Sequence, residues 1–322
     1  MLVGLSHFLR GKMRYGREIA MVVNPSVPPA QPADSSTASA VDQALAEFEA
    51  ARAQPYYAEA ADRTDRDDYY ASLGGRPPPA SALSNHLEAT HNPRVRYDSG
   101  RSIYTWADLH EDQLLRSIYS GATFDPREAI ADAVLLDQRI KTLEARMADG
   151  RVSDSAGLQE IDLLAAASPY NCEHVVPQSW FRSSEPMRGD MHHLFACGNR
   201  CNSFRGNTPY FDFPDFRDVV QDDCGKREQV DSSAFGFEPK SGKAIVARAT
   251  LYFLLRYPGR ISKRSLPADR IPTLLAWHRG AAPNRYERHR NQAIFKRQGN
   301  RSPLIDFPEW ADAFDFAALL TA

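Results

Sequence analysis

Apolar residues recur at helical spacing through the first half of the chain. In residues 41–54, VDQALAEFEAARAQ, Leu45 and Phe48 fall on one face of a helix, while Asp and Glu side chains fall on the other. Residues 105–120 and 126–149 repeat this alternation. The pattern predicts three amphipathic helices that serve as a scaffold.

A stretch rich in proline, serine and alanine precedes these helices. Residues 24–40, NPSVPPAQPADSSTASA, have no apolar period, which predicts a disordered linker. We therefore expect residues 1–40 to form an N-terminal tail and residues 41–322 to form a single domain.

The pattern changes between residues 170 and 210. Residues 173–180 and 191–197 are short runs of His, Val, Leu and Phe, which predict two strands. Residues 202–207, NSFRGN, predict a short helix that begins at an asparagine. The expected local order is therefore strand, loop, strand, helix.

Helical spacing returns in the last third of the chain. Residues 243–257, 271–278 and 284–298 predict three further helices, the first of which ends at Pro258 and Gly259. A few short strands among many helices predict an α+β fold.

Chain length and hydropathy favour a folded protein with a buried core over a membrane-spanning one. The chain has 322 residues, of which 43% are hydrophobic, so it can bury a sizeable core. No apolar run reaches the length that spans a bilayer, and no membrane partner is expected. The N-terminal residues show no export signal, which favours a cytoplasmic protein, and we expect a monomer.

The net charge of −2 hides an uneven distribution. The basic region, residues 240–301, holds 15 Lys and Arg but only two acids, Asp269 and Glu287. This excess predicts either a polyanionic partner or the solvated faces of ordinary helices. The residues expected to point outward and contact nucleic acid are Arg285, Arg288, Lys296 and Arg297.

Candidate chemistry is concentrated in the central stretch. Glu173 and Asn202 are hard oxygen donors, which suit Mg²⁺, Mn²⁺ or Ca²⁺. His174 would be near neutral at pH 7 and could take a proton from water that attacks phosphorus. Each residue alone is more often a surface carboxylate, a helix cap or a core histidine, and only their combination favours catalysis.

Three motifs occur together and in order: NCEHVVPQSWF, GDMHHLFAC and CNSFRGNTPY. They resemble the endonuclease I family of sugar-non-specific bacterial nucleases, whose active site is the ββα-metal (His-Me) finger. The resemblance continues at GKAIVARATLYFLLRYPGRI, LLAWHR and RNQAIFKRQGNRSPLIDFPEW, and so covers the last half of the chain. It implies a finger core at about residues 170–210.

The resemblance also implies residue roles. Glu173 and Asn202 would bind the metal, His174 would be the general base, and Arg182 or Arg188 would hold the cleaved phosphate. The residues expected to support this site are Asp190, His192, His193, Arg205 and Asn207. The implied activity is metal-dependent hydrolysis of DNA, and of RNA as well, with little sequence preference. Many proteins of this family are secreted or periplasmic.

Four cysteines lie in or just after the motifs, at Cys172, Cys197, Cys201 and Cys224. The inferred strand pairing would bring them together, which favours a structural zinc site of four thiolates. Two disulfides, or four separate thiols, are the alternatives.

Two other functions share these sequence features. One is a zinc-braced nucleic-acid-binding module without catalysis, and the other is a site-specific HNH-type endonuclease. Loss of cleavage without loss of binding in His174→Ala would exclude the first, and a smear in place of a ladder of products would exclude the second.

Overall fold

The computed structural model describes residues 35–74, 77–216, 223–232 and 234–321. In these ranges helices are combined with three antiparallel sheets of two strands each, which confirms the α+β class. The predicted tail falls outside the described residues as far as residue 34. Residues 35–40 are already helical, so the linker prediction was wrong for them.

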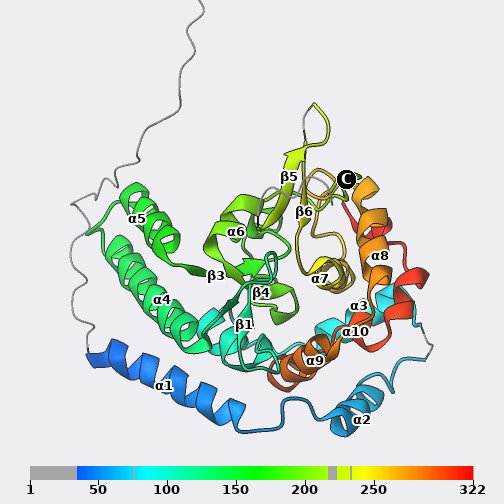
Figure 1. Ribbon diagram of the computed structural model, residues 1–322, viewed down its shortest axis with the longest axis horizontal. Coiled ribbons are helices and arrows are strands. Elements are labelled where there is room, and N and C mark those ends of the chain that lie inside the picture. Colours follow the sequence, from blue (N-terminus) through cyan, green and yellow to red (C-terminus); the bar gives the residue numbers. More distant parts are fainter. Residues whose placement is uncertain (1–34, 75–76, 217–222, 233, 322) are drawn as a thin grey trace, which may run out of the picture.

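The α-helices are α1 (Ser35–Arg52), α2 (Glu59–Tyr69), α3 (Ala80–Thr90), α4 (Pro126–Ala148), α5 (Asp154–Ala167), α6 (Asn199–Arg205), α7 (Lys243–Arg256), α8 (Ile271–Gly280), α9 (Arg285–Gln298) and α10 (Pro303–Asp306). The strands are β1 (Leu115–Arg116), β2 (Thr123–Phe124), β3 (Tyr170–His174), β4 (Leu194–Gly198), β5 (Gly225–Gln229) and β6 (Phe235–Pro239). Figure 1 shows the β3–β4 hairpin and α6 in the middle of the molecule, with α4 and α5 on one side and α7 and α8 on the other.

The predicted helices at the two ends of the domain are present as α1, α4, α7, α8 and α9. Local capping explains two of their boundaries. Asp125 precedes α4 and accepts a hydrogen bond from the backbone N–H of Arg127 at 2.8 Å. Asn284 and Glu287 form a capping box at the start of α9, and Gly299 ends that helix in a left-handed conformation.

The helix predicted over residues 105–120 was wrong. The chain forms a π-helix at Ser99–Ala107, then turns, and continues into β1. At the turn, the buried Asp108 carboxylate accepts hydrogen bonds from Arg290 and, at 2.6 Å, from the Tyr286 hydroxyl. The pairing of the buried Asp108 with the distant Arg290 therefore determines the path of the chain here, in place of the helix that the periodicity of residues 105–120 predicted.

The central hairpin is shorter than predicted. Strand β3 ends at His174, and β4 begins only at Leu194. Asp190 accepts a hydrogen bond from the backbone N–H of His192 at 3.0 Å, which winds Met191–His193 into a 3-10 turn. Helix α6 begins three residues before the predicted start, so Asn202 lies inside the helix and is not its cap.

The register of the hairpin assigns its side chains to two cores. Phe195 pairs with Glu173, and its side chain joins a core built on α7, α8 and the C-terminal segment. Leu194 and Ala196 point the other way, into a second core that includes Phe48 of α1 and Ile130 of α4. Both faces of β4 are therefore buried, which holds the hairpin rigidly.

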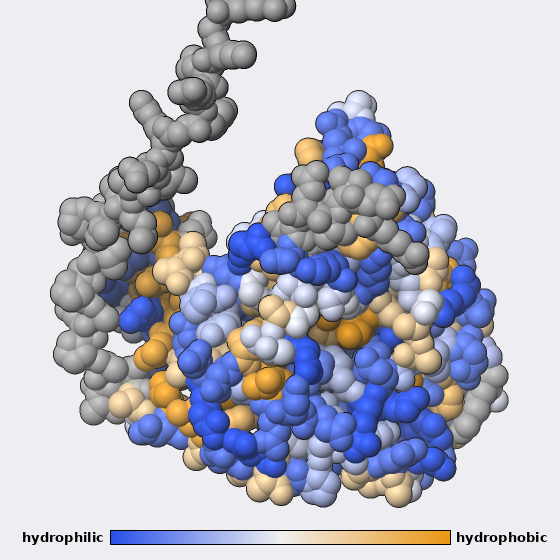
Figure 2. Space-filling view, viewed as in Figure 1, coloured by the Kyte–Doolittle hydropathy of each residue, from blue (hydrophilic) through white to orange (hydrophobic). Residues whose placement is uncertain are grey.

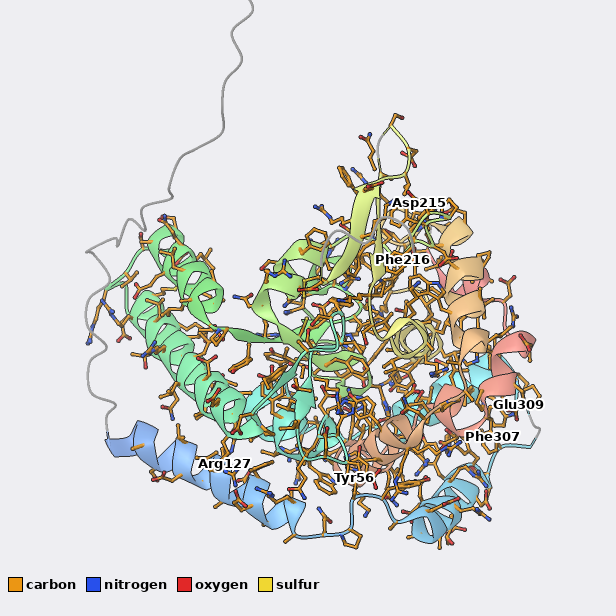
Figure 3. The ribbon with its side chains drawn as sticks, viewed as in Figure 1. Tyr56, Arg127, Asp215, Phe216, Phe307 and Glu309 are labelled. Atoms are coloured by element: carbon orange, nitrogen blue, oxygen red, sulfur yellow. A yellow bond between two sulfur atoms is a disulfide. The ribbon has the colours of Figure 1, made fainter. Side chains whose placement is uncertain are left out.

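The elements that were not predicted include α2, α3, α5, α10 and the β5–β6 hairpin. Helix α5 packs along α4, and the β5–β6 hairpin projects from the body beside α6 (Figure 1). On the opposite side α1 is tied to α4 by the ion pair of Arg127 with Glu49; Arg127 is labelled in Figure 3. The face in view in Figure 2 is mostly hydrophilic, as expected for a folded domain.

Candidate active site

A cavity of about 220 Å³ lies where β3, the segment after it and α6 meet. It brings together three residues that the sequence singled out separately, Glu173, His174 and Asn202. Its other lining residues are Tyr97, Asn171, Cys172, Pro177, Gln178, Ser179, Arg205, Gly206 and Asn207.

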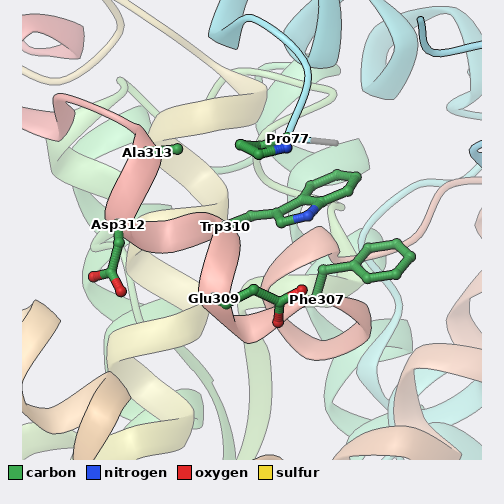
Figure 4. A pocket seen from close by; sticks show the side chains of 6 residues that line it. All are labelled: Pro77, Phe307, Glu309, Trp310, Asp312 and Ala313. Atoms are coloured by element: carbon green, nitrogen blue, oxygen red, sulfur yellow. The ribbon is translucent and has the colours of Figure 1, made fainter. Parts of the chain in front are cut away.

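A larger cavity of about 490 Å³ lies near the C-terminus and is less suited to hydrolysis. Figure 4 shows the aromatic rings of Phe307 and Trp310 there, with the carboxylates of Glu309 and Asp312. Its lining contains no histidine, and two carboxylates repel a phosphate. We therefore take the smaller cavity as the candidate active site.

Glu173 is the buried acid of this cavity, with only 2% of its surface exposed. Its Oε1 atom accepts hydrogen bonds from the Tyr119 hydroxyl at 2.6 Å and from Nη1 of Arg205 at 2.8 Å. The described residues donate no hydrogen bond to Oε2. Burial raises the pKa of Glu173 to about 7, and the Arg205 guanidinium opposes this rise.

The hydrogen-bond chain behind Glu173 has a defined direction. The Tyr119 and Tyr210 hydroxyls are 2.8 Å apart. Because the ionised carboxylate can only accept, Tyr119 donates its proton to Glu173, and Tyr210 must donate to Tyr119. Nothing in the sequence pattern singles out Tyr119, which lies 54 residues before Glu173, whereas Tyr210 ends the motif CNSFRGNTPY.

Arg205 fixes α6 against the end of β3. Its side chain is 1% exposed, and besides Glu173 it donates to the carbonyl oxygens of Val175 at 2.9 Å and of Thr208 at 3.1 Å. A buried cation with several acceptors is a rigid link between the segments that supply them. Asn207, also expected to support the site, lines the cavity.

His174 is held so that one ring nitrogen keeps a lone pair. Its Nε2 lies 3.0 Å from the carbonyl oxygen of Arg188, which can only accept, so Nε2 carries the proton. Nδ1 is then unprotonated, with the Gln178 amide nitrogen 3.4 Å away. Burial, helped by His193, lowers the pKa of His174 well below its usual value. The imidazole is therefore neutral and able to accept a proton at Nδ1.

The donor set fits a hard divalent cation. Glu173, whose Oε2 accepts no hydrogen bond from the described residues, and the partly exposed Asn202, which carries an amide oxygen, line the same cavity. The described residues contain no group of three or more His, Cys, Asp or Glu side chains that could hold a metal. Such a sparse set leaves positions for water and phosphate oxygens, which is typical of Mg²⁺ sites.

The two candidate arginines lie in different surroundings. The exposed Arg188 guanidinium is 5.2 Å from the centre of the Tyr97 ring, and that ring is 5.0 Å from the His174 ring. Arg182 is also exposed, in a left-handed conformation with φ of 58°, and does not line the cavity. Arg188 does not line the cavity either, but it lies over Tyr97, which does, so it is the arginine in contact with a residue of the cavity lining.

Asp190 lies outside the cavity as the centre of a hydrogen-bond network. It accepts hydrogen bonds from the hydroxyls of Tyr252 at 3.0 Å and Tyr257 at 2.9 Å, from Gln298 at 2.8 Å, and from the backbone of His192. Burial acts to raise the pKa of Asp190, but the neighbouring histidines and these donors hold it at about 2. The network joins the turn before β4 to α7 and α9.

His192 and His193 also lie outside the cavity lining. Nε2 of His192 is 3.3 Å from the carbonyl oxygen of Asn300, and Nε2 of His193 is 2.6 Å from that of Met187. Burial lowers the pKa of both histidines to about 4, so both are neutral donors at pH 7. These contacts are consistent with a role for both histidines in orienting the segments around the site.

The predicted four-cysteine zinc site was wrong. Cys201 and Cys224 form a disulfide, and Cys172 and Cys197 are buried free thiols. The register explains the error, because Cys172 pairs with Ala196, one position away from Cys197. A shift of one residue sends the two thiols to opposite faces of the hairpin and into different cores. The alternative of two disulfides was wrong for the same reason.

The basic region has two populations of cations. Four of its arginines are buried, Arg256 among them, and the other three are neutralised by carboxylates, which the charge count did not reveal. Their pairs are Arg248 with Glu287, Arg290 with Asp108, and Arg301 with Asp62 and Asp306. The four predicted nucleic-acid contacts, Arg285, Arg288, Lys296 and Arg297, are exposed on α9, but none of them lines the cavity.

Comparison with known proteins places these features in context. The model of the family described as Endonuclease I matches residues 83–309. An extracellular ribonuclease of Bacillus subtilis (strain 168) is 33% identical over 159 residues, which cover 44% of this chain and 53% of that protein. An extracellular deoxyribonuclease of Aeromonas hydrophila is 32% identical over 161 residues, covering 44% of this chain and 66% of that protein.

The extent of these matches is partial. The chain spans about half the length of the two Bacillus ribonucleases that it matches, 53% of each. Among the described residues, no helix has both the length and the apolar character that crossing a membrane requires.

Proposed function

The chain belongs to the endonuclease I family, and on this premise we propose that it is a divalent-metal-dependent endonuclease. It would hydrolyse phosphodiester bonds of DNA, and of RNA as well, with little sequence preference. The names of its relatives support both substrates, since the Bacillus protein is called a ribonuclease and the Aeromonas protein a deoxyribonuclease.

We take β3, β4 and α6 as a ββα-metal finger. The support is the order of these elements, an antiparallel hairpin followed directly by a helix at Gly198. In this arrangement Glu173 comes from the first strand and Asn202 from the helix. The single observation that carries the proposal is that Glu173, His174 and Asn202 line one cavity.

The chain's own groups would divide the work as follows. Nδ1 of His174 takes the proton from the attacking water, while the Arg188 carbonyl oxygen holds the opposite side of the ring. Glu173 and Asn202 would hold the metal. When bound, a cation such as Mg²⁺, Mn²⁺ or Ca²⁺ would neutralise charge on the phosphate and stabilise the leaving oxygen. Arg188, held over Tyr97, would contact the non-bridging phosphate oxygens.

The disulfide bears on where the protein works. A bond between Cys201 and Cys224 persists in oxidising compartments and is rare in the cytosol. We therefore favour an exported protein over the cytoplasmic location expected from the N-terminal sequence. Because Cys172 and Cys197 are buried, thiols are titrated after unfolding under non-reducing conditions. Two reduced cysteines are expected, and four would return the assignment to the cytoplasm.

A plasmid digestion tests the activity. Supercoiled plasmid is incubated with the purified protein in excess EDTA, and Mg²⁺ is then added back, beside the His174→Ala variant. Conversion to a smear of short fragments, only with metal and with wild-type His174, is the expected result. Intact but bound plasmid would favour a binding module, and discrete fragments would favour a site-specific enzyme. Structured RNA is digested in parallel.

A further inference from the structure

The projecting β5–β6 hairpin carries an exposed aromatic ring. Phe235 is 47% exposed, and the other large hydrophobic residues that are exposed in the described chain, Leu158 and Leu163, both lie on α5. Figure 2 shows hydrophobic positions among hydrophilic ones on this projection. An exposed ring at the end of a two-stranded ribbon contributes little to a core, so its chemistry suits contact with another molecule.

An exposed guanidinium lies against this ring. Gln229 pairs with Phe235 and Arg227 with Phe237, so Arg227 and Phe235 are diagonal neighbours on one face of the ribbon. The Arg227 guanidinium carbon is 5.0 Å from the centre of the Phe235 ring. The two side chains therefore form one surface that is both flat and positively charged, which we call the hairpin platform.

The hairpin platform is linked to the rim of the active-site cavity. Nε of Arg227 donates a hydrogen bond to Oγ1 of the buried Thr208 at 2.8 Å. Thr208 follows Asn207, which lines the cavity. Below the platform, Phe237 packs on Phe204 of α6, with the ring centres 6.1 Å apart. The hairpin that carries the platform therefore packs on α6, the helix that also supplies residues to the cavity lining.

Charge distinguishes the two faces of the hairpin. On the other face Lys226 is neutralised by Asp215 at 2.7 Å and by Glu228 at 3.3 Å; Asp215 is labelled at the base of the hairpin in Figure 3. Arg227 makes no ion pair with any carboxylate of the described residues. Within the described part of the chain, the platform face therefore presents a positive charge that no carboxylate pairs with, next to an aromatic ring, a combination that suits a nucleotide.

We propose that Phe235 stacks on an unpaired base of the substrate strand whose phosphate occupies the cavity, while Arg227 contacts an adjacent phosphate. This inference rests on the nuclease function proposed above and adds a preference that the catalytic residues do not supply. A base inside a duplex is already stacked on both faces, so the platform would favour single-stranded over double-stranded nucleic acid.

Binding of fluorescein-labelled oligonucleotides tests the inference. Anisotropy is measured in EDTA with His174→Ala protein, so that nothing is cleaved, for a single strand and for the duplex of the same sequence. Adding Phe235→Ala should weaken single-strand binding by roughly five- to a hundredfold, the effect of losing one stacked base. Duplex binding should change less than about twofold, since it rests on phosphate contacts. Phe235→Trp should retain or improve single-strand binding.

Two controls make the result specific. Leu163→Ala removes an even more exposed hydrophobic side chain from α5 and should leave binding unchanged. Phe235→Leu keeps an apolar side chain but removes the ring, and should behave as Phe235→Ala does. Unchanged melting temperatures would show that each variant is folded.

Three results would overturn the inference. If single-strand binding is unchanged in Phe235→Ala, or retained in Phe235→Leu, then Phe235 does not bind by stacking. The nuclease proposal would stand in either case. Equal losses of affinity for the single strand and for the duplex in Phe235→Ala would show that Phe235 contributes to nucleic-acid binding in general and does not stack on an unpaired base. Failure of the wild-type protein to bind or cleave any nucleic acid would overturn both proposals together.

Discussion

Two buried carboxylates lie seventeen positions apart in the central stretch, and their surroundings differ in one decisive way. Asp190 has donors on both oxygens, four in total. Against the effect of burial, the neighbouring His192, His91 and His193, together with the Gln298 donor, hold its pKa at about 2. Glu173 has donors on Oε1 only, and burial raises its pKa to about 7. Both oxygens of Asp190 accept hydrogen bonds from the protein. Oε2 of Glu173 accepts none from the described residues, which leaves it available to a ligand in the cavity.

This difference separates folding from chemistry. A carboxylate whose donors are all supplied by the fold stabilises that fold, and removing it leaves buried donors without acceptors. A carboxylate with a free oxygen on a cavity is suited to binding a cation. Substitutions around Asp190 should therefore change stability, and those around Glu173 should change metal binding and catalysis.

The largest effect is expected at the cavity, from His174→Ala. Loss of the general base should reduce the rate of DNA hydrolysis by roughly 10²- to 10⁴-fold. Gel-based initial rates with saturating Mg²⁺ measure it, and binding of intact DNA in EDTA serves as the control. A variant that retains more than about a tenth of the wild-type rate would show that another group accepts the proton.

The next largest effect is expected at the satisfied carboxylate. Asp190→Asn replaces an acceptor oxygen by a donor facing Tyr252 and Tyr257, and should lower the free energy of unfolding by about 2–3 kcal/mol. Urea denaturation measures this change. The rate per folded molecule should stay within about twofold of wild type. A stable but inactive variant would place Asp190 in the chemistry and end the contrast.

Acidification should reveal the same carboxylate. Its folded-state pKa of about 2 lies below the ordinary value of 3.8, so its stabilisation is complete above pH 4 and is lost as pH falls towards 2. The part of the acid-induced loss that is due to this group should amount to about 2 kcal/mol and be absent from Asp190→Asn. Unfolding free energies at several acidic pH values measure it. Parallel curves for both proteins would contradict the assignment.

Smaller effects are expected behind Glu173. Tyr119→Phe removes the hydroxyl that orients the carboxylate and should weaken Mn²⁺ binding by roughly tenfold. Tyr210→Phe removes the next hydroxyl along the chain and should have a smaller effect in the same direction. Calorimetric titration with Mn²⁺ measures both. If both variants keep the melting temperature and the Mn²⁺ affinity of the wild-type protein, the two tyrosines have only a packing role.

Much of the scaffold could be predicted from the sequence because its signals are local. Helices α4, α7, α8 and α9 follow from apolar spacing and capping residues. The helix predictions succeeded because each depends on residues close together in the chain. Glu173, His174 and Asn202, singled out by their chemical types in combination, line one cavity, while their roles stay predictions.

The remainder depends on distant partners. Tyr119 meets Glu173 across 54 residues, and Arg290 meets Asp108 across 182, so no sequence window contains either pair. The cysteine error came from a register that is shifted by one position, which alternation along a strand cannot reveal. Charge counting failed for the buried arginines because a count cannot separate a solvated cation from a paired one.

The central claim is that the free oxygen of Glu173 binds a divalent cation. Calorimetric titration of Mn²⁺ into wild-type, Glu173→Gln and Asp190→Asn proteins tests it most directly. The account predicts one site in the wild type, no measurable site in Glu173→Gln, and wild-type affinity in Asp190→Asn. Wild-type affinity in a folded Glu173→Gln protein would contradict it.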